Sequence, residues 1–213
     1  PPITVANAQV SGAVIGGIAR EGIADALRRL VDAIPGEDAS LSEVLLRLGA
    51  RGYGFAMFLL AAPNLTPGPS IPGFSTIFGL PMLALAIGMA MGWPSPRLPR
   101  WIGDRRLPRA RLARVVAAIL PIAARADLLL RPRLPRLAAA RRVNGAVFAL
   151  LAALLVLPFP FVSLAASAAA LLLALGVLAE DGVAIAFGHA AALASLVLYA
   201  AFAWLAVEAL GAL

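Results

Sequence analysis

Polar side chains that could bind a ligand gather around two proline-containing breaks in otherwise uncharged segments. The candidate substrate site consists of Asn64, Thr66, Pro67, Gly68, Pro69, Ser70 and Ser75 around the first break and Pro158, Pro160 and Ser163 around the second. A proline inside a helix removes a backbone hydrogen bond, so neighbouring amides and carbonyls are open to other partners. In membrane transporters, such broken helices form substrate sites near the middle of the bilayer. The residues therefore predict two re-entrant hairpins whose tips converge on a site.

The same breaks also fit a simpler structure, in which each break is a short turn between two ordinary membrane spans. The segment Tyr53–Ala62 before the first break holds about ten residues, whereas roughly 20 apolar residues cross a bilayer core. This shortness keeps a re-entrant hairpin possible beside the simple turn, while Phe74–Gly92 is nearly long enough for a span. Both interpretations stay open from the sequence.

The two broken segments resemble each other. Pro67-x-Pro69 matches Pro158-x-Pro160 at an offset of 91 residues, and Leu85–Met89 matches Leu173–Val177 at an offset of 88. An internal duplication with a three-residue gap explains both matches. Chance alignment of leucine- and alanine-rich sequence explains them as well.

A second set of residues with a chemical role lies in an arginine-rich segment. Arg111, Arg114 and Arg125 fall on one face of a helix predicted over residues 109–130, because an α-helix has 3.6 residues per turn. The apolar residues assigned to the other side are Val115, Val116, Ile119, Leu120 and Ile122. Such a helix lies in the membrane interface with its arginines among the phosphates of anionic lipids. The arginines either bind a phosphate-bearing lipid or lipid-linked sugar, or only anchor the segment in the cytoplasm.

The composition requires that much of the chain faces lipid. Hydrophobic residues make up 62% of the 213 and charged residues 14%, with a mean hydropathy of +0.91, whereas soluble domains are about half apolar and a quarter charged. We therefore predict an all-α, polytopic integral membrane protein with four to six membrane-embedded helices. The segment 93–142 holds 13 of the 18 basic residues, and the positive-inside rule places it in the cytoplasm. Its hydrophobic flanks argue against nucleic acid as a partner.

The predicted organisation follows from these charge patterns. A polar N-terminal extension (1–40) precedes a membrane domain (41–207) and a tail (208–213), and the membrane domain divides into a broken hairpin (52–92), the cytoplasmic arginine-rich segment (93–142), a second broken hairpin (143–179) and a terminal helix (183–207). Within the extension, Ile18–Ile34 predicts an amphipathic helix. Ser40 and Glu43 form a capping box at the start of another helix.

Several kinds of chemistry are excluded by the residues that are missing. The chain has no cysteine and one histidine, His189, so a structural zinc site is not expected, and no cofactor or metal is predicted. No catalytic motif is present, so we expect no enzyme. An enzyme of lipid-linked sugars is the alternative, but it would need acids in the membrane portions. Glu180 and Asp181 are placed at a turn, and His189 in helix packing rather than in a proton relay.

Several motifs together resemble one protein family. Ala62-Pro63-Asn64-Leu65-Thr66-Pro67-Gly68-Pro69, Gly73-Phe74-Ser75-Thr76, Gly79-Leu80-Pro81, Trp93-Pro94-Ser95-Pro96, Leu107-Pro108-Arg109, Arg131-Pro132-Arg133-Leu134, Leu157-Pro158-Phe159-Pro160 and Gly176–Gly182 are similar to the ExoD family of exopolysaccharide synthesis proteins. The resemblance covers about residues 41–207, with residues 1–40 outside it. It implies a bacterial inner-membrane protein associated with exopolysaccharide synthesis or export, but no known reaction or set of functional residues.

Two functions follow from these expectations. In the first, the protein handles a lipid-linked or anionic precursor at the broken hairpins. In the second, it is a structural subunit without transport activity, whose arginine helix docks on anionic lipid or on a polysaccharide synthase. The expected partners are anionic membrane lipids, and also exopolysaccharide synthesis proteins or further copies of the chain.

Overall fold

The computed structural model describes residues 22–34, 36, 38–49, 51–66, 73–97, 103–131, 133–157 and 160–211, and their fold is almost entirely helical. The elements are α2 (Ile23–Asp32), β1 (Asp38–Ser40), α3 (Leu41–Arg47), α4 (Arg51–Ala61), the 3-10 helix η1 (Ala62–Leu65), α5 (Phe74–Ala90), β2 (Arg106–Pro108), α7 (Arg109–Leu129), α8 (Pro135–Ala139), α9 (Arg141–Val156), α10 (Pro160–Ala179) and α11 (Gly182–Gly211). The predicted helical class is confirmed, with one unpredicted addition: β1 and β2 form a short antiparallel pair.

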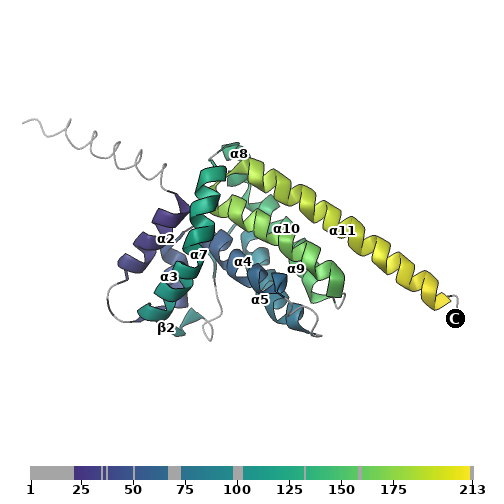
Figure 1. The fold of residues 1–213 in the computed structure, drawn as a ribbon, viewed down its shortest axis with the longest axis horizontal. Helices are drawn as coiled ribbons and strands as arrows, with labels where there is room; N and C mark the ends of the chain where they lie inside the picture. The colour runs from purple at the N-terminus through teal and green to yellow at the C-terminus, as the bar shows by residue number, and fades with distance from the viewer. Residues whose placement is uncertain are drawn as a thin grey trace, which may run out of the picture.

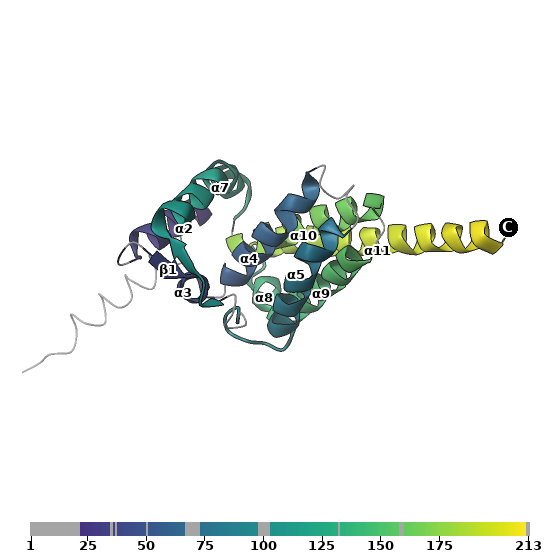
Figure 2. The ribbon, with the colours of Figure 1, turned by 90° about the horizontal axis from the view of Figure 1, so that it is seen from below.

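A small lobe is formed by α2, α3, α7 and the two strands (Figure 2). Because Leu27 on α2 and Leu112 and Val116 on α7 lie on facing stripes at helical spacing, the two helices pack on each other and bury these side chains. Asp127 of α7 caps the start of α2, since its carboxylate accepts from the backbone N–H groups of Ile23 (2.7 Å) and Ala24. The lobe thus joins residues that lie about a hundred positions apart.

The predicted capping box at Ser40 is confirmed in one of its two bonds. Ser40 is the N-cap of α3, and its hydroxyl oxygen accepts from the backbone N–H of Glu43 at 3.1 Å. The Glu43 carboxylate accepts instead from Arg47 at 2.8 Å, one helical turn later. The cap therefore fixes where α3 begins, and the glutamate stabilises the middle of the helix.

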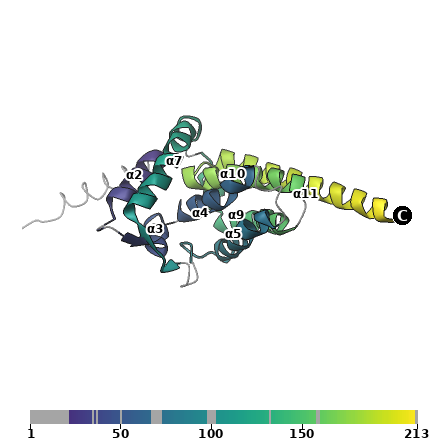
Figure 3. The same cartoon turned by 60° about the horizontal axis from the view of Figure 1, so that its bottom comes forward.

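Four helices, α4, α5, α9 and α10, form the apolar unit at the centre of the molecule. As Figure 3 shows, α4 lies beside α10 and α5 lies beside α9, so among these four helices each packs mainly on a helix of the other broken segment. Close approach is possible because Gly54 faces the backbone of Leu178 and Gly145 faces the backbone of Ala90, in positions where any side chain would overlap the neighbouring helix. We call these four helices with η1 the four-helix unit.

The contacts within the four-helix unit repeat at the offsets found in the sequence. Gly145 follows Gly54 by 91 residues, and Leu178 follows Ala90 by 88. The ends of α5 and α10 also match: Gly92 and Glu180 both have left-handed backbones, and the next amide donates back to Gly88 and Gly176, respectively. Matching prolines could arise by chance, but matching packing and matching helix ends favour an internal duplication.

Both broken segments point the same way in the four-helix unit. The starts of α4 and α9 lie beside the ends of α10 and α5, as Arg51 beside Glu180 and Arg142 beside Gly92 demonstrate. At the opposite end, Thr76 at the start of α5 reaches Val156 at the end of α9. The unit thus has an arginine end, where residues 51, 92, 142 and 180 meet, and a hairpin-tip end, where the chain breaks.

Helix α11 is the longest element and the most exposed apolar one. It packs along α10 from the arginine end, and its C-terminal part projects beyond the four-helix unit (Figure 1). Its segment Gly182–Ala209 has a mean hydropathy of 2.1, and large side chains such as Phe187, Val197 and Trp204 are more than 60% exposed. Within the described residues, this is the one helix long and apolar enough to cross a membrane.

The predicted number of membrane-embedded helices is not confirmed by the helix lengths. Phe74–Ala90 and Ser163–Ala179 are apolar but shorter than a full span. A 17-residue helix is about 25 Å long at 1.5 Å per residue, against about 30 Å for a bilayer core. Over the described residues, the structure thus establishes an almost entirely helical fold with one helix that fits a membrane span.

Candidate functional site

At the hairpin-tip end, two predicted site residues hold the end of the first broken helix. The Asn64 side-chain amide donates to the carbonyl of Leu60 at 3.2 Å, and the Thr66 hydroxyl donates to the carbonyl of Pro63 at 2.6 Å. A helix end leaves its last carbonyls without partners. Asn64 and Thr66 therefore satisfy the backbone of their own broken helix.

The second broken helix is capped from neighbouring helices. The hydroxyl of Tyr199 on α11 lies 2.9 Å from the carbonyl oxygen of Leu154 and 3.1 Å from that of Leu157, and Thr76 donates to Val156 at 3.3 Å. The single hydroxyl proton of Tyr199 is shared between two carbonyls, so Tyr199 and Thr76 together supply two donors to the carbonyls at the end of α9. This matters in an apolar surrounding, where an unpaired carbonyl costs several kcal/mol.

Some polar capacity at this end remains unused. Asn64 is fully buried, and its side-chain oxygen has no hydrogen-bond partner within the described part of the chain. The same holds for the hydroxyl of Ser167 on α10, the helix that packs along η1. Ser75 and Ser163 are buried as well, at equivalent positions 88 residues apart. The structure thus collects buried Asn and Ser side chains near the tips.

The remaining members of the predicted hairpin site cannot be placed. Pro67, Gly68, Pro69, Ser70 and Pro158 lie outside the described residues, and Pro160 is described only as the first residue of α10. The predicted convergence of both tips on one site therefore stays a prediction.

The predicted arginine helix is confirmed as α7, which ends one residue before the expected limit. Arg111, Arg114 and Arg125 are all exposed. The apolar side was assigned only in part: Val116 and Ile119 are buried against the lobe, but Val115 and Ile122 are 40% and 45% exposed, and the buried stripe runs instead through Leu112, Ala123 and Ala126. The sequence did not reveal that α2 would cover one face, and this partner decides which apolar residues are buried.

The exposed face of α7 therefore combines basic and apolar side chains. At 100° per residue, Val115 and Ile122 lie beside the stripe of Arg111, Arg114 and Arg125, not opposite it. Leu129, which is 78% exposed, continues the same strip. We call this surface the α7 arginine face.

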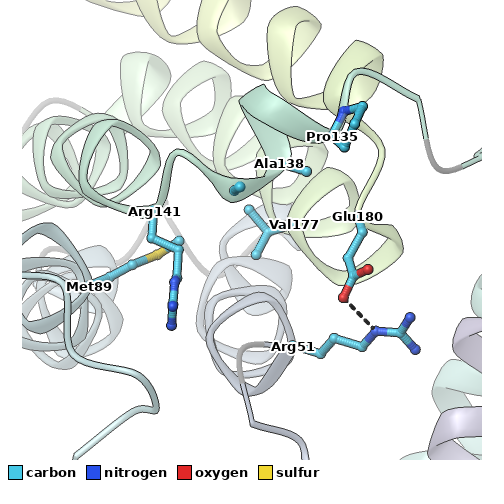
Figure 4. Close-up of a pocket in the computed structure, with 8 residues that line it drawn as sticks. Arg51, Met89, Pro135, Ala138, Arg141, Val177 and Glu180 are labelled. Carbon is cyan, nitrogen blue, oxygen red and sulfur yellow. Dashed lines mark hydrogen bonds and ion pairs between the residues drawn. The ribbon is translucent and has the colours of Figure 1, made fainter. Parts of the chain in front are cut away.

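The arginine end of the four-helix unit carries a pocket that the sequence analysis did not identify. It has a volume of about 320 Å³ and lies between α4, α5, α8, α9 and α10; the lining residues are Arg51, Met89, Pro135, Ala138, Ala139, Arg141, Val177 and Glu180. In Figure 4, the Arg51–Glu180 ion pair (3.2 Å) forms one side of the pocket, and Arg141 lies on another. We call it the central pocket.

A second pocket of about 330 Å³ adjoins the central one. It is lined by Gly92, Ala139, Ala140, Arg141, Arg142 and Val143, so Ala139 and Arg141 belong to both. Arg141 is positioned by the segment after α5, because its guanidinium donates to the carbonyl of Pro94 at 3.3 Å. Nearby, the Arg97 guanidinium stacks 5.1 Å from the centre of the Trp93 ring. We call this second cavity the Arg142 pocket.

Asp181 is buried, although it was placed at a solvent-facing turn. One carboxylate oxygen accepts from the backbone N–H of Val183 at 2.9 Å, and the other accepts from that of Arg131 at 3.0 Å. Asp181 thus caps the start of α11 and ties the chain after α7 to it. Glu180 is half exposed and pairs with Arg51.

A signal for the arginine end was present in the sequence. The 91-residue offset that aligns the proline pairs also aligns Arg51 with Arg142, and the 88-residue offset aligns Gly92 with Glu180. Only the fold shows that these four positions meet.

No group of three or more His, Asp or Glu side chains suited to a metal occurs among the residues placed by the structure.

The fold and these features define a helical protein with an apolar four-helix unit, one helix that fits a membrane span and an arginine-lined end. Residues 23–201 match the family model described as "Exopolysaccharide synthesis, ExoD", so the chain belongs to the ExoD family. It is 30% identical over 199 residues to Protein ExoD of Rhizobium meliloti (strain 1021), covering 91% of this chain and 82% of that protein. No solved structure matches the chain.

Membership confirms the predicted family and its association with exopolysaccharide synthesis. The match begins at residue 23, whereas the sequence resemblance was placed from about residue 41 onward. This earlier start includes α2, the helix that packs on α7. The small lobe is thus part of the family domain.

Proposed function

We propose that this ExoD family chain is a multi-pass protein of the bacterial inner membrane that supports exopolysaccharide synthesis by binding an anionic, lipid-linked precursor. The observation that carries the proposal is an apolar four-helix unit with arginine-lined pockets at one end. An amphiphile with a phosphate headgroup needs this combination, because its chain partitions into lipid while its charge stays at the interface.

The membrane location is supported by α11 and by the distribution of charge. A free-standing apolar helix of this length is stable next to acyl chains, whereas in water its surface would be exposed at a high cost. The four-helix unit packs along α11 and carries no charged side chain between Arg51 and Glu180 on α4, α5 and α10, or after Arg142 on α9. We propose that α5 and α10 lie in the same membrane and that the arginine end faces the cytoplasm.

The anionic ligand is supported by the balance of charge in the central pocket. Glu180 offsets the charge of Arg51, while Arg141 forms no ion pair among the described residues. Guanidinium groups bind phosphate oxygens in a bidentate manner, more strongly than neutral donors do. We propose that the protein binds the precursor without a chemical reaction, so the precursor is released chemically unchanged.

The α7 arginine face supports a second candidate function, a docking subunit. Exposed Val115, Ile122 and Leu129 beside three arginines have the pattern of a helix that rests on an anionic membrane surface. In this function the protein would hold a polysaccharide synthase, or another copy of itself, at the membrane.

One experiment separates the two functions. In a strain deleted for the gene, we expect Arg141→Gln to lower the amount of secreted polysaccharide, while the triple change of Arg111, Arg114 and Arg125 to Gln leaves it nearly unchanged. The opposite result would favour docking. Membrane content of each variant is measured in parallel, and mass spectrometry of lipids that copurify with the wild-type chain identifies a bound phospholipid or lipid-linked sugar.

The topology is tested with reporter fusions. A reporter that is active only in the cytoplasm, inserted after Arg105, is expected to be active, and activity of a periplasm-specific reporter at the same place would overturn the orientation. Retention of the full-length chain in carbonate-washed membranes is the expected result for an integral protein.

A further inference from the structure

The two halves of the four-helix unit differ in charge at one pair of equivalent positions. Arg51 corresponds to Arg142, and Glu180 corresponds to Gly92. In one half, the Arg51 and Glu180 side chains form an ion pair at 3.2 Å. In the other half, a Cβ atom built on Gly92 would lie 3.2 Å from Nε of Arg142. The second half thus has the arginine of the pair and lacks the carboxylate.

The missing carboxylate coincides with a cavity. The Arg142 pocket opens beside Gly92, and two of the residues that line it are Arg141 and Arg142. Neither arginine forms an ion pair with any other residue that the structure describes. Glu180 lines the adjoining central pocket, and its carboxylate is engaged by Arg51. Two arginines therefore line a cavity whose described lining contains no acid.

We infer that the Arg142 pocket binds a phosphate group, which occupies the place that the Glu180 carboxylate has in the other half. Carboxylate and phosphate present similar pairs of oxygens to the planar fork of a guanidinium. In this inference the two halves arose by gene duplication, and position 92 holds glycine where the other half has the carboxylate. The arginine of the second half then binds an external anion in place of that carboxylate. The inference rests on the proposed function, because it names the arginines that hold the phosphate of the precursor.

The phosphate could belong to a lipid headgroup or to a soluble phosphate, and two probes distinguish these sources. Purified full-length protein in a neutral detergent is titrated with phosphatidic acid, followed by native mass spectrometry, and with inorganic pyrophosphate, followed by calorimetry. Arg142-dependent binding of phosphatidic acid alone assigns the pocket to lipid headgroups. Arg142-dependent binding of pyrophosphate assigns it to soluble phosphates as well.

Two variants remove the site by different means. Arg142→Gln deletes the guanidinium, and Gly92→Glu supplies the missing carboxylate from the neighbouring helix end. Each is expected to weaken binding about ten-fold or more, the size of one charge-assisted hydrogen bond. Gly92 has φ 85°, where a side chain strains the backbone, so Arg142→Gln, which leaves the backbone unchanged, is the primary test.

Matched controls separate the site from general charge effects. Arg28→Gln removes an exposed arginine that lines neither pocket and already pairs with Asp25, and it is expected to leave binding within about two-fold of the wild type, since an exposed ion pair contributes little. Gly36→Glu introduces the same acid at another glycine of positive φ with open space around it, and should also leave binding unchanged. If Arg142→Gln folds poorly, Arg142→Lys replaces it in the test. This variant keeps the charge and should retain part of the affinity.

The inference is overturned if Arg142→Gln and Gly92→Glu bind both probes like the wild type, or if Arg28→Gln weakens binding as much as Arg142→Gln does. The proposed function is judged by a different readout, the polysaccharide secreted by the complemented deletion strain. If the protein binds phosphate at Arg142 but deletion of its gene leaves secretion unchanged, the Arg142 site stands and the proposed function is refuted. If the variants bind both probes normally while secretion still depends on the gene, the proposed function stands and the proposed Arg142 site is refuted.

Discussion

The two ends of the four-helix unit use their polar side chains for different purposes. At the hairpin-tip end, Asn64, Thr66 and Tyr199 donate to carbonyls that a broken helix leaves open. At the arginine end, the backbone is closed by left-handed helix ends, and Arg141 and Arg142 line pockets. Where the backbone satisfies itself, side chains are available for a ligand. The comparison thus supports the proposal of a ligand site at the arginine end.

The first prediction tests the packing on which both ends depend. Replacing Gly145 with Leu should lower the free energy of unfolding by about 3 kcal/mol, because the new side chain overlaps the backbone of α5 near Ala90. Denaturant unfolding in detergent measures the change. Gly211→Leu is the control, since nothing lies near that glycine, and an equal loss there would remove the packing argument.

The second prediction concerns the charged cap at the arginine end. Asp181→Asn should destabilise the fold by about 1–2 kcal/mol, since one amide oxygen cannot replace two carboxylate oxygens that accept from α11 and from Arg131. Protease cleavage between α7 and α8 should become faster. Unchanged stability and unchanged cleavage would contradict the role of this cap.

The third prediction addresses the cap at the hairpin-tip end. Tyr199→Phe leaves the shape of the side chain but removes the donor to the carbonyls of Leu154 and Leu157. The expected loss is about 1 kcal/mol in the free energy of unfolding, because buried carbonyls lose a partner. Thermal unfolding in detergent provides the measurement, with Trp204→Phe as the control on an exposed part of α11.

The fourth prediction has the smallest expected effect and sharpens the comparison most. Asn64→Leu places the residue found at the equivalent position 155, so stability should change by less than about 0.5 kcal/mol as a buried, partly unpaired amide is replaced by a hydrocarbon. If the tips only close the backbone, secreted polysaccharide stays at the wild-type amount. A clear loss of secretion with a stable fold would establish the predicted hairpin site.

The sequence predicted the features that depend on neighbouring residues. Helix α7 follows from its own periodicity to within a residue, and Ser40 marks the start of α3 because the cap and its amide lie three residues apart. The uncharged segments likewise predicted the helices of the four-helix unit. These are local patterns, and a single chain displays them without knowledge of the fold.

The features that the sequence did not predict depend on distant partners. Asp127 caps a helix more than 100 residues earlier, and β1 pairs with β2 across a shorter but still long gap, from Asp38 to Pro108. The prediction placed Val115 on the covered side of α7, but Val115 is 40% exposed. The spacing of apolar residues in α7 does not show which of its faces α2 covers. The pocket arginines were missed for the same reason: each lies at a helix start with no local motif, and only packing brings them together.

Helix α11 has a consequence for the bilayer around the molecule. Its 30 residues are about 45 Å long, whereas the 17 residues of α5 reach about 25 Å. In the proposed arrangement, where α5 also lies in the membrane, these two helices would demand different hydrocarbon thicknesses, a mismatch that membranes relieve by local thinning and by helix tilt. Lipids beside α5 would be compressed relative to those around Trp204, and such a thinned annulus would shorten the path of any headgroup between leaflets.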